Sequence, residues 1–168
     1  DGLMNHPQQA MWERLLVMLA EAQSSFQEYF ALLTHEEHTI RRMDRKGLTD
    51  VNGQKEQVLD RMCRLEQQVE RELQQLVGAT VTENLLSWLK KAADPRAQSA
   101  HGMLTELLRL ARMIQEQGKK NEALICRIQH RVREAIHLMY TGVGTGPVYQ
   151  GSGIMNFPSV PSSVHLQG

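Results

Sequence analysis

The sequence predicts an all-α protein: an elongated antiparallel bundle of three long helices with coiled-coil-like packing, one short helix and a C-terminal tail rich in Gly, Pro and Ser. Apolar residues recur at spacings of three and four along most of the 168 residues, which is the period of an amphipathic helix. Aromatic residues make up only 5% of the chain and methionines number nine, a balance that suits helix-on-helix packing better than a sheet sandwich. Near residue 140 this periodicity gives way to the tail. We therefore expect a helical bundle over residues 1–140 and an extended, mobile tail over residues 141–168.

The first two long helices are expected to form a hairpin. The first runs to about Lys46, because Gly47 can end it. Thr49 or Asp50 can cap the second helix, which continues to Gly78. Two helices joined by so short a connection should pack antiparallel.

A short segment and a third long helix follow. The segment TENLLSWLKKAAD has too little polar face for a solvated helix, so we expect it to lie across the end of the hairpin. Asp94 and Pro95 then read as an N-cap followed by proline at the first helical position. The helix that they begin has about 46 residues and spans roughly 69 Å, so its neighbours must run alongside it. Its middle, QEQGKKNE, places Gly118 and Asn121 at seam positions, which predicts a loosened or bent seam, or an end segment that moves semi-independently.

Composition excludes several classes of protein. Lysine plus arginine equals aspartate plus glutamate at 19 each, so no net charge draws the chain to nucleic acid or to an anionic membrane. Cys63 and Cys126 lack the spacing of a zinc site, and they argue against a disulfide framework. No stretch approaches the roughly 18 consecutive apolar residues of a membrane span. We expect a cytoplasmic chain without membrane insertion, nucleic-acid partner or cofactor.

The histidines do not form a convincing reactive site. The run HEEH at residues 35–38 lacks the i, i+4 spacing that puts two imidazoles on one helix face. Glu134 and His137 have the spacing of a di-iron bundle, but no second such pair exists. The stretch around His101 faintly resembles a histidine phosphotransfer helix, a family that usually presents a lysine where this chain has Leu104. The sequence therefore predicts that the protein is not an enzyme.

Lys55 falls where the hairpin seam expects an apolar residue, between Val51 and Val58. Its ammonium either reaches solvent while its stem packs, or pairs with Glu36 or Glu37 on the opposite helix. In both cases its expected role is to fix register rather than to catalyse a reaction.

The last predicted helix carries more apolar residues than one seam needs. Extra apolar positions require extra neighbours, so either both other helices cover them or they form a groove for an amphipathic helix of a partner. These positions are Leu124, Ile125, Ile128, Val132, Ile136, Leu138 and Met139.

Three stretches resemble, in their order and spacing, elements of one known family. GQKEQVLDRMCRLEQQVERELQQL is similar to a lysine-bearing hairpin helix, with Lys55 on the recurring lysine. KKNEALICRIQHRVREAIHLM is similar to a C-terminal helix in which Asn121 falls on a recurring asparagine. PVYQGSG resembles a tail signature of tyrosine followed by glycines, here with Gln150 inserted after Tyr149. Over residues 10–153 the chain thus resembles the FlgN-type flagellar export chaperones.

This resemblance implies a cytosolic type III export chaperone that needs no cofactor. Its expected clients are the C-terminal helical segments of hook-filament junction proteins of the FlgK and FlgL type, whose premature association it would prevent. Tyr149 is expected to dock on the cytosolic domain of an export gate of the FlhA type, and Lys55 and Asn121 to be structural residues of the seam. The residues expected to bind the client are Leu124, Ile125, Ile128, Val132, Ile136 and Met139.

Other interpretations stay open. A coiled-coil scaffold or oligomerisation module would self-associate through the same residues, and a phosphotransfer protein would carry a phosphoryl group on His101. A chaperone can also form a homodimer in which two copies cover each other until a client displaces one. In the tail, Ile154 and Phe157 either order on a partner together with Tyr149 or pack against the bundle.

Overall fold

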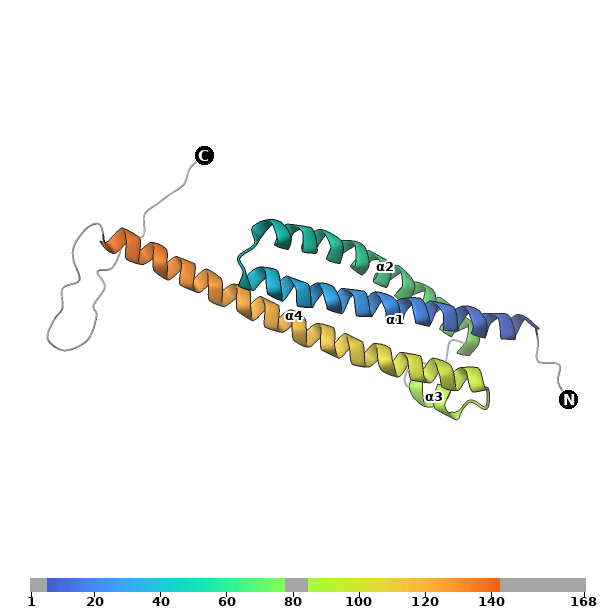
Figure 1. The fold of residues 1–168 in the computed structure, drawn as a ribbon. Coiled ribbons are helices and arrows are strands. Elements are labelled where there is room, and N and C mark those ends of the chain that lie inside the picture. The colour runs from blue at the N-terminus through green and yellow to red at the C-terminus, as the bar shows by residue number, and fades with distance from the viewer. Residues whose placement is uncertain (1–5, 78–84, 143–168) are drawn as a thin grey trace, which may run out of the picture. The chain divides into compact units, whose positions relative to one another are not determined.

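The computed structural model describes residues 6–77 and 85–142, and within them the chain is helical (Figure 1). The helices are α1 (His6–Arg41), α2 (Arg45–Val77), α3 (Leu85–Lys91) and α4 (Pro95–Gly142). Neither described range contains a strand. The prediction of an all-α fold with three long helices and one short helix is confirmed, whereas coiled-coil-like packing stays a prediction.

α1 and α2 form an antiparallel hairpin (Figure 1). Arg14, near the start of α1, pairs with Glu72 near the end of α2, and Glu36, near the end of α1, pairs with Lys55 in the first half of α2. The buried residues of α2 recur three, four or seven positions apart, which turns a single face of this helix inward. They are Val51, Val58, Met62, Leu65, Val69 and Leu73.

The end of α1 differs from the prediction, because the helix stops at Arg41 rather than near residue 46. Met43 adopts a positive φ of 53°. Its N–H donates to the carbonyl of Ile40 and the N–H of Asp44 donates to that of Thr39, both at 3.0 Å. This is the hydrogen-bond pattern of a Schellman motif, which is usually completed by glycine. A methionine in that role leaves no signal in the sequence.

Gly47, which was expected to end the first helix, belongs to α2. Asp44 caps this helix, because its Oδ1 accepts the N–H of Gly47 at 2.9 Å. A Cβ on Gly47 would lie 2.9 Å from Cγ of Asp44, so the missing side chain leaves room for the capping carboxylate. Thr49 and Asp50, the caps expected from the sequence, lie inside α2 and are exposed.

A hydrophobic core joins all four helices beside the start of α1. Leu15, Leu19, Leu89, Ala97 and Ala100 are each 0% exposed within it. Leu89 belongs to α3, so this short helix packs at the end of the hairpin as the sequence predicts. The two alanines belong to α4, and their small side chains favour a close approach of this helix to its neighbours.

The start of α4 is also confirmed. Oδ1 of Asp94 accepts the N–H of Arg96 at 2.9 Å, and Pro95 is the first residue of the helix. α4 continues to Gly142.

The chain divides into two compact units, Asp1–Cys126 and Arg127–Gly168. Residues 127–142 of the second unit are helical. Tyr149, Ile154 and Phe157 lie outside the described residues, so the division into a bundle over residues 1–140 and a tail over residues 141–168 stays a prediction.

Candidate functional site

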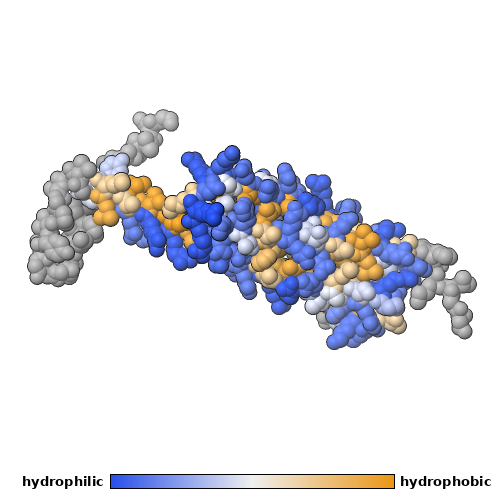
Figure 2. All heavy atoms as spheres, in the orientation of Figure 1, coloured by the Kyte–Doolittle hydropathy of each residue, from blue (hydrophilic) through white to orange (hydrophobic). Residues whose placement is uncertain are grey.

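An apolar face runs along the last part of α4. Leu124, Ile125 and Ile128 are half-buried, whereas Val132 and Ile136 are 45% and 47% exposed. Positions four apart lie on the same side of a helix, so this series of side chains forms a stripe. Figure 2 shows apolar residues gathered along this part of α4, with hydrophilic residues beside them. The apolar face of α4 consists of Leu124, Ile125, Ile128, Val132, Ile136 and Met139.

The exposure of the side chains on this face increases toward the end of α4. Met139 is 71% exposed, and the neighbouring Leu138 and Tyr140 are 58% and 80% exposed. These three side chains are therefore largely exposed. Large exposed apolar patches on a protein surface often mark sites where other proteins bind.

A polar cluster joins α1, α2 and α4 inside the first unit. Two of its side chains are among the most shielded polar groups of the described residues, since Glu36 is 6% and Asn121 is 2% exposed. A polar group at such depth is costly unless hydrogen bonds satisfy it. The polar cluster consists of Glu36, Glu37, Lys55, Gln117, Lys120 and Asn121.

The Glu36 carboxylate accepts hydrogen bonds from side chains of two different helices. Nζ of Lys55 donates to its Oε1, and Nδ2 of Asn121 donates to its Oε2, both at 2.8 Å. Of the two acidic partners that the sequence offers to Lys55, the structure thus selects Glu36. A buried carboxylate with a donor on each oxygen and one nearby cation is stable, whereas the same carboxylate without them is not.

Asn121 ties α4 to the backbone of α1. Its Nδ2 also donates to the carbonyl of Leu33 at 2.8 Å, and its Oδ1 accepts the side-chain amide of Gln117 at 2.9 Å. The other buried residues on the described part of α4 are Ala97, Ala100 and Leu110, all nearer its start. Between Leu110 and Cys126, Asn121 is therefore the one fully buried residue of α4, and it contacts α1 through hydrogen bonds.

Glu37 is the second anchor between α1 and α4. It accepts from Arg41 at 2.8 Å, from the Gln117 amide at 2.7 Å, and pairs with Lys120 at 3.1 Å. The Arg41 guanidinium, followed by the Gln117 amide and the Lys120 ammonium, lowers the pKa of Glu37 from 4.5 to about 2. The carboxylate is ionised at neutral pH and holds these three donors.

Lys55 and Asn121 were predicted from the sequence as seam residues, whereas Gln117 and Lys120, in the polar stretch QEQGKKNE, were not. That stretch suggested a loosened seam, yet its polar side chains contact α1. The sequence did contain a signal for this contact. Glu36 and Asn121 both occupy seam positions, and a buried polar group needs another polar group as its hydrogen-bond partner.

The remaining candidates come together in no reactive site within residues 6–77 and 85–142. No group of three or more His, Cys, Asp or Glu side chains there could hold a metal ion. His101 is half-buried on α4, and Glu134 pairs with His130 at 3.1 Å one helical turn away. Cys63 and Cys126 are exposed thiols. None of the described helices combines the length and apolar character needed to cross a membrane.

Comparison with known families decides the relationship. A family model described as FlgN protein matches residues 11–156. The chain belongs to the FlgN family. The resemblance noted from the sequence is confirmed, and FlgN proteins are flagellar export chaperones that bind export substrates. No curated protein and no solved structure matches the chain.

Proposed function

We propose that this FlgN-family protein is a cytoplasmic type III export chaperone for hook-filament junction proteins of the FlgK and FlgL type. It would bind their C-terminal helical segments on the apolar face of α4 and deliver them to the export gate. The observation that carries the proposal is the exposure of this face in a chain of the FlgN family. Binding of this kind needs neither nucleotide nor metal.

The spacing of the apolar face suits a helical client. Leu124, Ile128, Val132 and Ile136 follow one another at intervals of four residues, so they present a stripe into which an amphipathic helix can pack its own i, i+4 residues. Junction proteins polymerise through helices that have no partner before export. Covering those helices would prevent premature association.

Binding to the C-terminal segments of the junction proteins tests this proposal directly. Isothermal titration calorimetry of the full chain should show tight 1:1 binding to these segments and none to a scrambled helix of equal composition. Equal binding to both peptides would instead favour a scaffold whose apolar face binds amphipathic helices non-specifically. Self-association at the same concentrations, without client binding, would favour the oligomerisation module.

Ile136→Asp is the variant that tests the role of the apolar face most directly. Ile136 is 47% exposed, so a charge there costs little folding stability but would be buried by a client. We expect client binding to weaken by about 2 kcal/mol or more, which is roughly thirtyfold in Kd. Ile128→Asp should act in the same direction, although Ile128 is half-buried and the free protein must be checked for folding. Leu59→Asp, at an exposed leucine of α2, is the matched control and should bind normally.

Tyr149 is the residue that we propose to dock on an export gate of the FlhA type. The family match extends to residue 156 and so includes this tyrosine. Tyr149→Ala should spare client binding and impair binding to the cytosolic domain of the gate, whereas Tyr140→Ala should leave gate binding unchanged. Equal loss of client and gate binding in Tyr149→Ala would contradict this assignment.

The polar cluster has a structural role in this proposal. We infer that Lys55 and Asn121 set the register of α2 and α4 on α1, because both donate to Glu36 and because an apolar contact would tolerate sliding. A fixed register would hold α2 and the part of α4 around Asn121 in one position along α1.

In the absence of client, two copies could cover each other through the apolar face of α4. Sedimentation equilibrium should then detect a homodimer that Ile136→Asp weakens and that client peptide dissociates. A free chain that stays monomeric at high concentration would rule out this arrangement.

A further inference from the structure

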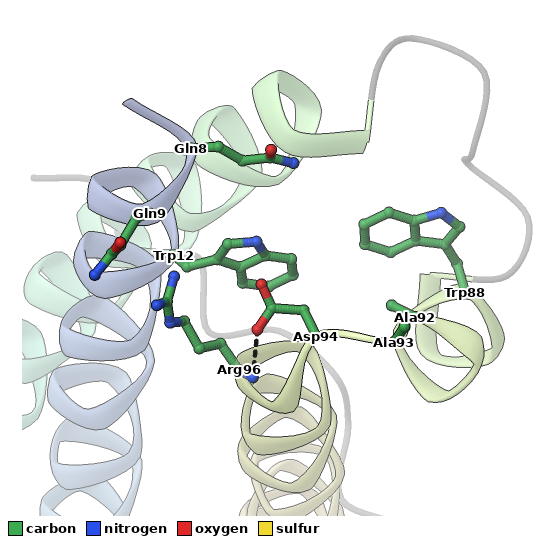
Figure 3. Close-up of a pocket in the computed structure, with 8 residues that line it drawn as sticks. All are labelled: Gln8, Gln9, Trp12, Trp88, Ala92, Ala93, Asp94 and Arg96. Carbon is green, nitrogen blue, oxygen red and sulfur yellow. Dashed lines mark hydrogen bonds between the residues drawn. The ribbon is translucent and has the colours of Figure 1, made fainter. Parts of the chain in front are cut away.

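A pocket of about 200 Å³ lies between α1, α3 and the start of α4 (Figure 3). It belongs to the first unit, and neither the apolar face of α4 nor the polar cluster contributes to it. Its lining residues are Gln8, Gln9, Trp12, Trp88, Ala92, Ala93, Asp94 and Arg96.

Two indole rings form one wall of the pocket. Trp12 and Trp88 are the two tryptophans of the chain, and their ring centroids are 6.3 Å apart with only 10° between the ring planes. Trp12 is 3% exposed, whereas Trp88 is half-buried. Figure 3 shows the two rings beside one another, with the short link from α3 to α4 next to them. Such a pair offers a rigid apolar surface to another side chain.

Arg96 brings an unused hydrogen-bond donor to the same pocket. Its Nη1 is buried and has no acceptor within the described part of the chain. The carboxylate of Asp94 does not supply one, because the bond that it makes to Arg96 is to the backbone N–H at the start of α4. A buried guanidinium nitrogen without an acceptor is unfavourable, and Arg96 lines the pocket, so an incoming carboxylate that reaches the guanidinium would gain a strong charge-assisted hydrogen bond.

We propose that this pocket binds the C-terminal end of a polypeptide whose last residue is apolar. The terminal carboxylate pairs with the guanidinium of Arg96, and the last side chain packs on Trp12 and Trp88. The volume fits, because a cavity of about 150 Å³ holds a benzene ring and the pocket is somewhat larger. A chain end also carries backbone N–H groups, for which the Asp94 carboxylate is an acceptor, and Asp94 repels its single negative charge less strongly than it repels a multiply charged inorganic anion.

Intrinsic tryptophan fluorescence tests the proposal, because both tryptophans line the pocket. The full chain is titrated with acetyl-Ala-Ala-Phe bearing a free carboxylate and with the same peptide as its C-terminal amide. The acid should give a saturable change, and the amide should bind about tenfold more weakly, as expected for the loss of one charge-assisted hydrogen bond. Equal responses to acid and amide, or no response to either, would overturn the proposal.

Two further probes separate a chain end from a small carboxylate. N-acetylphenylalanine carries the same ring and carboxylate without the preceding residues, and acetate carries the carboxylate alone. Both should bind more weakly than the peptide acid. Binding of N-acetylphenylalanine as tight as that of the peptide would overturn recognition of a chain end and point to a small aromatic acid.

Arg96→Gln removes the charge and should weaken binding of the peptide acid about tenfold while leaving the amide unchanged. Arg96→Lys should restore part of the difference. Arg112→Gln, at an exposed arginine on the same helix, is the matched control and should bind like the natural chain. If Arg96→Gln does not fold, the salt dependence of the acid–amide difference in the natural chain decides, and a difference that added salt does not reduce refutes the ion pair.

Discussion

Asn121→Ala should destabilise the protein more than any substitution of an exposed residue on α4. Asn121 is 2% exposed, and its Nδ2 donates to Oε2 of Glu36 and to the carbonyl of Leu33, each at 2.8 Å. A hydrogen bond to a charged acceptor contributes about 1.5–3 kcal/mol, and one to a neutral acceptor about 0.5–1.5 kcal/mol. Because the two bonds share one amide and are not fully additive, we expect a loss of about 2–4 kcal/mol in the free energy of unfolding.

Urea unfolding followed by circular dichroism measures this loss. Glu122→Ala is the matched control, since Glu122 is the exposed neighbour on the same helix, and it should change the free energy of unfolding by less than about 0.5 kcal/mol. A double-mutant cycle with Glu36→Gln should return a coupling of about 1 kcal/mol or more between the two side chains. An Asn121→Ala protein as stable as the natural chain would refute the view that hydrogen bonds fix this part of α4.

Asn121→Asp separates hydrogen bonding from side-chain shape. The variant keeps the size of the side chain but places a second carboxylate where the amide meets Glu36. Two adjacent carboxylates repel one another when both are ionised, so this variant should be less stable than Asn121→Ala at neutral pH. Urea unfolding of the two variants at neutral pH measures this difference. An Asn121→Asp protein as stable as Asn121→Ala would mean that the two side chains move apart.

Three further predictions follow from other contacts. The pKa of Glu37 is lowered from 4.5 to about 2, so its contribution to stability is complete above pH 4.5 and is lost as the pH falls toward 2; Glu37→Gln should flatten this part of the pH profile of unfolding. Gly118→Ala should raise the free energy of unfolding by up to about 1 kcal/mol in urea titrations, because the added Cβ meets no atom within 4 Å apart from its chain neighbours and the adjacent backbone of its own helix. Asp44→Ala should cost about 1 kcal/mol in the same assay by removing the cap of α2, and an unchanged midpoint would contradict that role.

Local periodicity predicts the helices of this fold but not every helix end. The spacing of apolar residues predicted three long helices and one short helix, and Asp94 and Pro95 marked the start of α4 correctly. These features depend on neighbours a few residues away. The end of α1 could not be predicted, since Met43 adopts a conformation that sequence patterns assign to glycine.

Only part of the candidate site could be predicted from the sequence. The apolar face of α4 was visible as a stripe, but its exposure depends on which helices lie beside it. Lys55 had two acidic candidates one position apart, and only the packed hairpin selects Glu36. The pocket formed by Trp12, Trp88 and Arg96 had no sequence signal beyond the rarity of tryptophan, because its residues come from three helices.

By itself, then, the sequence determined the helical class, the approximate extent of the helices and membership of the FlgN family, because these depend on local periodicity and on the order of motifs along the chain. Tertiary structure decided the rest. Asn121 meets a carbonyl and a carboxylate more than 80 residues earlier, and Trp12 meets Trp88 across a similar separation. Such pairs are set by how helices are placed in register against one another, and no pattern within a single helix contains that information.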